Sequence, residues 1–267
     1  MRLWRKYLTK WRFRQPGPSC VLEVLPGVFS SELDNRRDVL VALPASYSQG
    51  DRRYPVVYMQ DGQNLFDPKT SFAGDWGLGD ALANAAREGA EPIVVAVPNM
   101  GAERINEYSP FVDPVNGGGQ GDRYVDFLIR TLKPVVDQVY RTRPEPAGTG
   151  IAGSSMGALI SLYAFLRNPE VFGFAGILSP SIWFANGAIL PYAEQTATPR
   201  GRIYLDVGTA EGGETLQRAR ELRDTLIRKG YRLRHDLRWV EERGGRHHES
   251  TWGRRFGRAL PFLLSEA

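Results

Sequence analysis

The chain has 267 residues, a length that suits one large α/β domain with a single core. Hydrophobic residues make up 42% of it and charged residues 24%, and these proportions exclude a disordered or fibrous protein. Residues 1–14 hold six basic and no acidic side chains, whereas the remainder holds 28 basic and 30 acidic ones, so the net charge of +4 does not indicate a nucleic-acid partner.

Residues 1–20 form a basic, aromatic-rich arm that either lies on an anionic surface or, as is commoner for a chain terminus, packs on the domain. No segment contains the apolar run of a signal peptide or of a membrane span, so we expect no membrane span and a cytoplasmic location. Cys20 is the single cysteine, which excludes an internal disulfide, and no nearby histidine would activate it.

From about residue 37 onward, short apolar runs alternate with amphipathic segments, a pattern typical of a mostly parallel sheet with helices on both faces. The expected strands are 21–25, 37–43, 55–60, 92–98, 149–153, 172–178, 202–207 and 232–240. The expected helices are 78–87, 123–140, 156–167, 214–229 and 251–264. Residues 21–267 are therefore predicted to form a single α/β domain, and the long glycine-containing stretch 99–122 to form a wall or lid of its site.

The sharpest local motif is Gly153-Ser154-Ser155-Met156-Gly157, a G-x-S-x-G match between an expected strand and an expected helix. This is the context of a nucleophile elbow, in which the serine sits at a strained turn and flanking glycines let strand and helix approach. We expect Ser155 to be a nucleophile, the N–H of Met156 to stabilise an oxyanion, and Ser154 to be structural. The alternative is a plain glycine-serine turn before a helix.

A serine nucleophile needs a histidine base later in the chain, and three histidines are available. His235 falls on the apolar face of the expected strand 232–240, where a core histidine is the commoner explanation. His247 and His248 lie in a glycine-rich loop after the last strand, which is where an α/β hydrolase carries its base. We expect His247 to be the base, with His248 as the alternative.

The acidic partner of the histidine should follow the strand 202–207. Asp206 still lies within that strand, and Glu214 is expected to begin the next helix, where a carboxylate is favourable for the helix dipole alone. Glu211 is therefore the preferred third member, with Asp206 and Glu214 as alternatives.

Several blocks, spread over residues 35–264, make the chain resemble the Putative esterase family, which groups feruloyl esterases, siderophore esterases, S-formylglutathione hydrolases and mycolyltransferases. They are Asn35-Arg36-Arg37, residues 43–47, residues 54–67, Arg104 with residues 107–110, the serine elbow, Leu178-Ser179-Pro180-Ser181 with Trp183, residues 208–211, and the His247 loop with Glu249 and Trp252. The resemblance, closest to a bacterial cytoplasmic branch, implies an α/β-hydrolase fold. It also implies that Glu211 is the acidic partner of the histidine, because relatives carry an acidic residue after a similar Gly-Thr pair. In the histidine motif this chain departs from the family, since His248 stands where relatives often have asparagine.

The turn Asp61-Gly62-Gln63-Asn64 follows the expected strand 55–60, where this fold supplies its second oxyanion N–H, so Gly62 or Gln63 would donate it. A simple glycine turn is the alternative. Expected loops on the same side of the sheet carry candidate substrate-binding residues, which could equally be core residues: Trp76, Arg104, Tyr108 and Trp183.

Together these features predict a serine esterase that cleaves small-molecule carboxylic esters through an acyl-enzyme, with no cofactor and no metal. Acyl transfer to an alcohol or sugar on the same triad is one alternative, and a non-catalytic binding protein on a hydrolase scaffold is another. The identity of the substrate and the oligomeric state are left open by the sequence.

Overall fold

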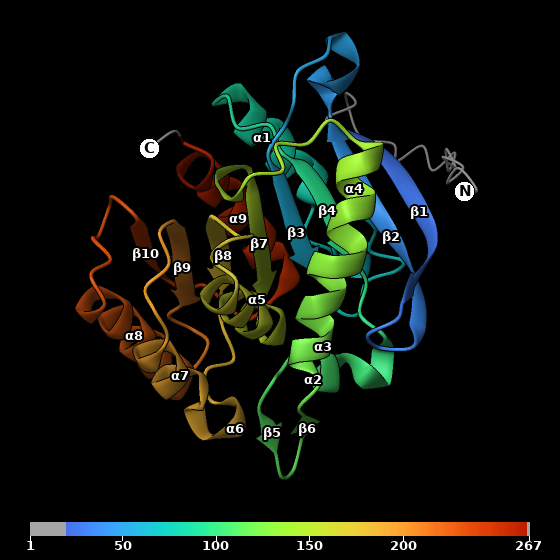
Figure 1. Ribbon diagram of the computed structural model, residues 1–267. Helices are drawn as coiled ribbons and strands as arrows, with labels where there is room; N and C mark the ends of the chain where they lie inside the picture. Colours follow the sequence, from blue (N-terminus) through green and yellow to red (C-terminus); the bar gives the residue numbers. More distant parts are fainter. Residues whose placement is uncertain (1–19, 266–267) are drawn as a thin grey trace.

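The computed structural model describes residues 20–265 and is built on an eight-stranded sheet in the order β1-β2-β4-β3-β7-β8-β9-β10 (Figure 1). Its strands are β1 Cys20–Ser30, β2 Asn35–Pro44, β3 Val56–Gln60, β4 Ile93–Val97, β7 Thr149–Ser154, β8 Phe174–Leu178, β9 Arg202–Gly208 and β10 Leu237–Glu242. The α/β-hydrolase fold class expected from the sequence is confirmed. The expected arm 1–20 lies outside the described residues except for Cys20.

The helices are α1 Leu78–Arg87, α2 Arg104–Glu107, α3 Gly121–Asp126, α4 Lys133–Val139, α5 Met156–Arg167, α6 Phe184–Gly187, α7 Ile189–Gln195, α8 Gly213–Arg228 and α9 Glu249–Leu263. A π-helical segment, Phe127–Leu132, joins α3 to α4, so the single helix expected over 123–140 is one continuous helical stretch with a widened middle. A two-stranded hairpin is formed by β5 Val112–Asp113 and β6 Gly117–Gly118.

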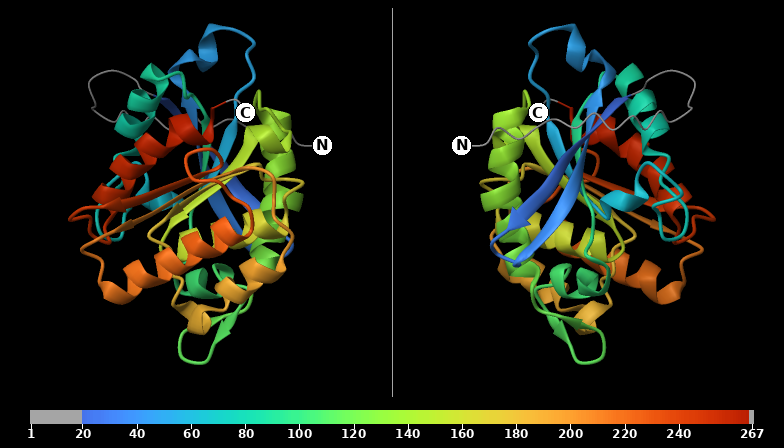
Figure 2. Two further views of the ribbon diagram at one scale, coloured as in Figure 1. Left: turned by 90° about the vertical axis from the view of Figure 1, so that its left-hand side faces the viewer. Right: turned by 90° about the vertical axis from the view of Figure 1, so that its right-hand side faces the viewer.

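In the large sheet β4, β3, β7, β8, β9 and β10 are parallel neighbours, whereas β2 pairs antiparallel with both β1 and β4. β3, β4 and β8 are buried at every residue, because helices cover both faces of the sheet (Figure 2). One core packs the sheet against helices that include α5, α7 and α8, and the other packs it against α1 and α9. The carboxyl ends of β3, β7, β8, β9 and β10 consequently share one edge, where ligands of open α/β sheets bind.

The last strand differs from its expected range. Residues 233–236 form a turn in which Arg234 has a φ of 70°, and β10 begins only at Leu237. The expectation that His235 faces the core is therefore wrong, since this histidine is exposed in the turn. No helix within residues 20–265 has the length and the apolar character to cross a membrane.

Candidate active site

Ser155 lies at the junction of β7 and α5. Its backbone has φ 56° and ψ −123°, a conformation that residues with a side chain rarely adopt. Its N–H donates to the carbonyl of Leu178 at 3.0 Å, and its own carbonyl accepts the N–H of Ser181 at 3.1 Å. These bonds hold the turn against the loop that follows β8. The strained serine of an elbow is thus fixed by its neighbours, as local strain at functional sites usually is.

The glycines on either side of Ser155 are required by close packing. A Cβ on Gly153 would lie 2.6 Å from the carbonyl carbon of Gly157, and a Cβ on Gly157 would lie 2.9 Å from Cβ of Gln60. Strand and helix can approach this closely only without side chains at the two positions. Ser154 is buried in β7, in agreement with a structural role.

The Ser155 hydroxyl has a polar partner that the sequence did not identify. Its Oγ lies 3.1 Å from Oγ of Ser181, and either hydroxyl can be the donor. Ser181 is itself buried and belongs to the loop after β8. The Ser155 hydroxyl is therefore oriented within the resting site rather than left to rotate in solvent.

His247 and Glu211 are brought together from adjacent loops, with Nδ1 of the imidazole 2.9 Å from Oε2 of the carboxylate. The Glu211 side chain is fully buried, whereas the His247 side chain is 42% exposed. The indole of Trp252 stands edge-on to the imidazole, with ring centroids 4.8 Å apart. One side of the imidazole is thus held by a buried carboxylate and an aromatic ring, while much of the ring faces solvent.

The loop after β9, which carries Glu211, and the loop after β10, which carries His247, pack closely because each has a glycine at the point of contact. A Cβ on Gly208 would lie 2.2 Å from the carbonyl oxygen of Gly245. Backbone hydrogen bonds then join the loops, from Thr209 N–H to the Glu242 carbonyl and from Ala210 N–H to the Gly245 carbonyl, both at 3.0 Å. This contact fixes the separation of the residues that follow each glycine.

The other oxygen of Glu211 is saturated by donors. Oε1 accepts from the Ser179 hydroxyl at 2.6 Å, from the Gly208 N–H at 2.8 Å and from Nη2 of Arg255 at 3.3 Å. Burial by itself would raise the pKa of Glu211, but the hydrogen bonds from His247, Ser179 and Gly208 and the charge of Arg255 outweigh it and lower the pKa. Glu211 is consequently an ionised, oriented carboxylate.

Arg255, on α9, is a buried cation below the candidate triad and was not singled out from the sequence. Besides Glu211, it contacts Asp206 with Nη1 3.2 Å from Oδ1, and its Nη2 donates to the Ser179 hydroxyl at 2.9 Å. Its position three residues after Trp252 and one before Phe256 puts a charge on the apolar face of a helix. That placement is the sequence signal that could have revealed it.

The alternative acids lie elsewhere. Asp206 is fully buried against Arg255, and its burial raises its pKa to about 7 against the opposing charge of Arg255 and the Ser179 N–H. Glu214 is exposed in the first turn of α8, a position that suits the helix dipole. Neither carboxylate has the hydrogen bond to an imidazole that Glu211 has.

His248 has a different role in the structure from its neighbour. It is the N-cap of α9, where its Nδ1 accepts the N–H of Ser250 at 3.3 Å and lies 3.1 Å from the Ser250 hydroxyl. Because Nδ1 is engaged within the same turn, this imidazole faces the helix terminus.

The turn after β3 is tightly packed around Gly62. A Cβ there would lie 2.5 Å from the carbonyl carbon of Ala96, so no side chain fits. The side-chain carbonyl of Gln63 accepts the Asn99 N–H at 3.2 Å, which ties the turn to the loop after β4. Gly62 and Gln63 form a short 3₁₀ turn at the same edge of the sheet as Ser155.

The preceding residue, Asp61, anchors this turn. It has a φ of 55°, its N–H donates to the Tyr108 hydroxyl at 3.0 Å, and its carboxylate is held by Arg104 through Nε at 2.7 Å and Nη2 at 2.9 Å. Burial would lower the pKa of Arg104, but the adjacent Asp61 raises it, so the guanidinium stays charged. The turn after β3 is therefore supported by an ion pair.

The four expected substrate-binding residues differ in solvent exposure: two are buried and two are partly exposed. Tyr108 is fully buried and Trp76 is 4% exposed, in contact with Trp252 and Phe256, so their expected place on the pocket surface is not supported and both are packing residues. Arg104 is 26% exposed and engaged with Asp61. Trp183 is 44% exposed, two residues beyond Ser181, and remains available to a ligand.

The stretch 99–122 and the segment after β8 lie together beyond the edge of the sheet that carries the candidate site. The β5–β6 hairpin and α6 are adjacent (Figure 1), and the Ala185 N–H donates to Asp113 at 3.3 Å. Within residues 20–265, no group of three or more histidine, cysteine or acidic side chains is arranged to hold a metal ion.

Comparisons with known proteins agree with this architecture. The model of the family described as "Putative esterase" matches residues 30–263. YbbA of Bacillus subtilis (strain 168) is 27% identical over 91% of this chain and 98% of its own length. An endo-1,4-beta-xylanase/feruloyl esterase of Xylanibacter ruminicola is 26% identical over 64% of this chain and 22% of its own.

Among solved structures, the BES protein from Bacillus cereus superposes with a TM-score of 0.74 at 21% identity, covering 97% of this chain and 99% of that one. This likeness shows the shared fold. Since the family model spans most of the chain, the chain belongs to the Putative esterase family and is a carboxylic ester hydrolase.

Proposed function

We propose that the chain hydrolyses small carboxylic esters through an acyl-enzyme, with Ser155 as nucleophile, His247 as general base and Glu211 as the acid that orients it. The observation that carries this proposal is the 2.9 Å contact between Nδ1 of His247 and Oε2 of Glu211. Because the carboxylate occupies Nδ1, the remaining nitrogen, Nε2, is the one that can exchange a proton with the serine.

In this mechanism Oγ of Ser155 attacks the ester carbonyl carbon while His247 takes the hydroxyl proton. The oxyanion that forms is stabilised by the N–H of Met156, at the start of α5, and by the N–H of Gly62 or Gln63. His247 then returns the proton to the departing alcohol. Water attacks the acyl-serine with His247 again acting as base, and the carboxylic acid leaves.

The buried carboxylate has a definite energetic task in this cycle. When His247 becomes an imidazolium, the ionised Glu211 stabilises the positive charge and keeps the ring in one tautomer. A lowered pKa of Glu211 suits this task, because the carboxylate stays charged at the pH at which the imidazole must be neutral.

For the substrate, we propose that Trp183 contributes an aromatic surface beside the nucleophile. It is 44% exposed and packs edge-on to Phe184, with ring centroids 5.9 Å apart. The Xylanibacter ruminicola relative is named in part a feruloyl esterase, which makes aromatic acyl groups a class worth testing. Arg104 lies at the same edge, where its exposed part can meet a polar substituent.

The decisive experiment measures hydrolysis of a series of p-nitrophenyl esters of increasing acyl length, together with methyl ferulate, by the wild-type chain and by Ser155→Ala. Turnover by the wild type that is lost in the variant supports the proposal. Binding without turnover of any ester would instead favour a non-catalytic protein on this scaffold. If an added alcohol captures most of the acyl group in place of water, the reaction is acyl transfer.

A further inference from the structure

The segment at the end of β8 and just beyond it, residues 178–181, contacts Ser155 at three points. The Leu178 carbonyl accepts the Ser155 N–H at 3.0 Å, and the Ser181 N–H donates to the Ser155 carbonyl at 3.1 Å. The third contact joins the two side chains, whose Oγ atoms lie 3.1 Å apart. Ser181 therefore contacts the reacting atom of the proposed nucleophile as well as its backbone.

The position of Ser181 is fixed by hydrogen bonds on both sides of it in the chain. Ser179 is fully buried, and its N–H donates to the carbonyl oxygen of Asp206 at 3.0 Å and to Oδ1 of the same residue at 3.2 Å. On the other side, the Phe184 N–H donates to the Ser181 carbonyl at 3.2 Å. A movement that took the Ser181 hydroxyl away from Ser155 would break several of these bonds.

The direction of the hydrogen bond between the two hydroxyls follows from the partners that each can find. Ser181 is 3% exposed, and within residues 20–265 its hydroxyl has Oγ of Ser155 as its only hydrogen-bond partner. A hydroxyl carries one proton and two acceptor lone pairs, and base catalysis needs the Ser155 proton on the side of His247. If Ser155 donated to Ser181 instead, the buried Ser181 proton would lack an acceptor, which costs free energy. Ser181 is therefore the donor and Ser155 the acceptor.

We propose that Ser181 is a further catalytic residue, whose hydroxyl donates to Oγ of Ser155 and stabilises the negative charge that develops on this atom. The inference rests on the proposed function, in which Ser155 is the nucleophile. In acylation, the Ser155 proton moves to Nε2 of His247 while Oγ bonds to the carbonyl carbon. In deacylation, that bond breaks, Oγ takes the electron pair, and His247 returns a proton to it. Ser181 keeps its own proton throughout.

Ser181 and the oxyanion donors act on different oxygens. The Met156 N–H serves the carbonyl oxygen of the substrate, whereas Ser181 serves the attacking oxygen. A donor lowers a barrier when it already points at the atom where charge develops, and the bonds around Ser181 provide this arrangement. Because Oγ is a neutral ester oxygen in the tetrahedral intermediate, its donor should contribute less than the roughly 10²- to 10³-fold of an oxyanion-hole donor.

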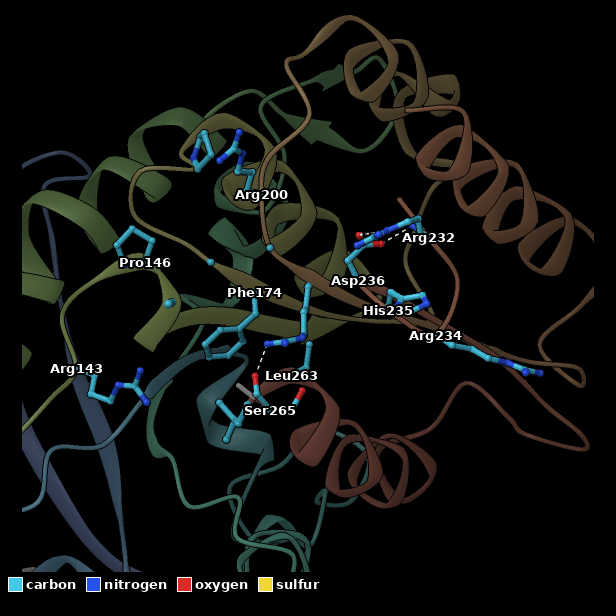
Figure 3. A pocket seen from close by; sticks show the side chains of 16 residues that line it. Arg143, Pro146, Phe174, Arg200, Arg232, Arg234, His235, Asp236, Leu263 and Ser265 are labelled. Atoms are coloured by element: carbon cyan, nitrogen blue, oxygen red, sulfur yellow. Dashed lines mark hydrogen bonds and ion pairs between the residues drawn. The ribbon is translucent and has the colours of Figure 1, made fainter. Parts of the chain in front are cut away.

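The hydroxyl pair is separate from the cavity of about 890 Å³ at the amino ends of β8 and β9 (Figure 3). Phe174, the first residue of β8, lines this cavity, whereas neither Ser155 nor Ser181 does. The length of β8, roughly 13 Å for a strand of this size, lies between the cavity and Leu178. Water or a ligand in the cavity therefore cannot replace Ser181 as the partner of Ser155.

The test compares single hydroxyl deletions in the hydrolysis of a p-nitrophenyl ester. Ser181→Ala should lower kcat by at least about tenfold and change KM by less than about twofold, because the donor acts on charge that develops only in the transition state. Inactivation by a fluorophosphonate should slow by a similar factor, since the same Oγ attacks phosphorus. Ser181→Cys keeps the shape with a weak S–H donor and should show nearly the same loss, which provides the measurement if the alanine variant does not fold.

The matched control is Ser161→Ala in α5. Ser161 is also fully buried, and its hydroxyl donates to the Gly157 carbonyl at 2.7 Å, far from the reacting oxygen in chemical role but on the same helix as the elbow. This variant should keep kcat within about twofold of the wild type. Urea unfolding of every variant shows that the rates compare folded proteins.

Three results would overturn the inference: wild-type kcat in a folded Ser181→Ala or Ser181→Cys variant, a loss that appears only in KM, or an equal loss of kcat in Ser161→Ala. Mass spectrometry of the fluorophosphonate adduct separates this inference from the proposed function. A label on Ser155 together with an unchanged rate in Ser181→Ala would remove the role of Ser181 alone. A wild-type label on another residue would remove the proposed nucleophile, and the role of Ser181 with it.

Discussion

The Nδ1 atom of His247 lies 2.9 Å from Oε2 of Glu211, and the two residues come from the loops that follow the adjacent parallel strands β10 and β9. The second oxygen of the same carboxylate accepts three hydrogen bonds, so its two oxygens are used for different purposes. One oxygen fixes the acid in the protein, and the other is left to orient the imidazole.

Removal of the proposed nucleophile should abolish turnover without unfolding the protein. Ser155→Ala is expected to lower kcat by about 10⁵- to 10⁶-fold, because the variant lacks the hydroxyl that would form the acyl-enzyme. Steady-state hydrolysis of a p-nitrophenyl ester measures the loss, and a fluorophosphonate followed by mass spectrometry locates the labelled residue. A label on Ser181 instead, or ordinary turnover by the variant, would show that Ser155 is not the nucleophile.

The adjacent histidines should respond differently to substitution. His247→Ala should reduce kcat to the level of Ser155→Ala, since both remove the same proton-transfer step. His248→Ala should leave most activity and cost about 1 kcal/mol of unfolding free energy, the usual value of a lost N-cap, while His248→Asn should restore the cap. Kinetics and urea unfolding on all three variants test the assignment, and the opposite ranking of activities would move the base to His248.

Loss of the Glu211 charge should impair catalysis more than stability. Glu211→Gln keeps the shape of the side chain but cannot hold the imidazolium, and kcat should fall by as much as about 10⁴-fold, as in the equivalent change in a serine protease. Glu214→Gln is the matched control and should cost no more than about 1 kcal/mol of unfolding free energy. Retention of most activity by Glu211→Gln, with loss in a folded Asp206→Asn variant, would reassign the acid.

Arg255 should prove essential to the buried network. Arg255→Met leaves Asp206 and Glu211 without their shared cation, which should lower the free energy of unfolding by about 3–5 kcal/mol. Arg255→Lys keeps the charge but loses the fork geometry, so we expect an intermediate loss. Chemical denaturation of both variants measures their free energies of unfolding. If Arg255→Met were as stable as the wild type, the buried cation would make no net contribution to stability.

The lowered pKa of Glu211 predicts the pH dependence of stability. A carboxyl group whose pKa is depressed by folding stabilises the native state above its unfolded pKa, and this contribution disappears as the pH falls through the folded value. The difference in unfolding free energy between wild type and Glu211→Gln should therefore shrink as the pH falls through the range below the usual pKa of 4.5. Urea unfolding at a series of pH values measures this difference. A difference that grows as the pH falls would contradict the lowered pKa of Glu211.

The sequence alone was sufficient wherever the signal is local. The expected helices 78–87 and 156–167 agree with α1 and α5, because amphipathic or apolar spacing and the residues that stop a helix are properties of consecutive positions. The G-x-S-x-G turn is local in the same sense, since the glycines on either side of Ser155 are needed by the elbow itself. The order of strands and helices likewise determined the fold class.

Only the tertiary structure decided what depends on contacts between distant segments. The sequence left Glu211, Asp206 and Glu214 as alternatives, and the packing of Gly208 against Gly245 is what brings Glu211 alone to His247. Burial of Tyr108 and Trp76 could not be read from aromatic residues in expected loops, because core and pocket use the same side chains.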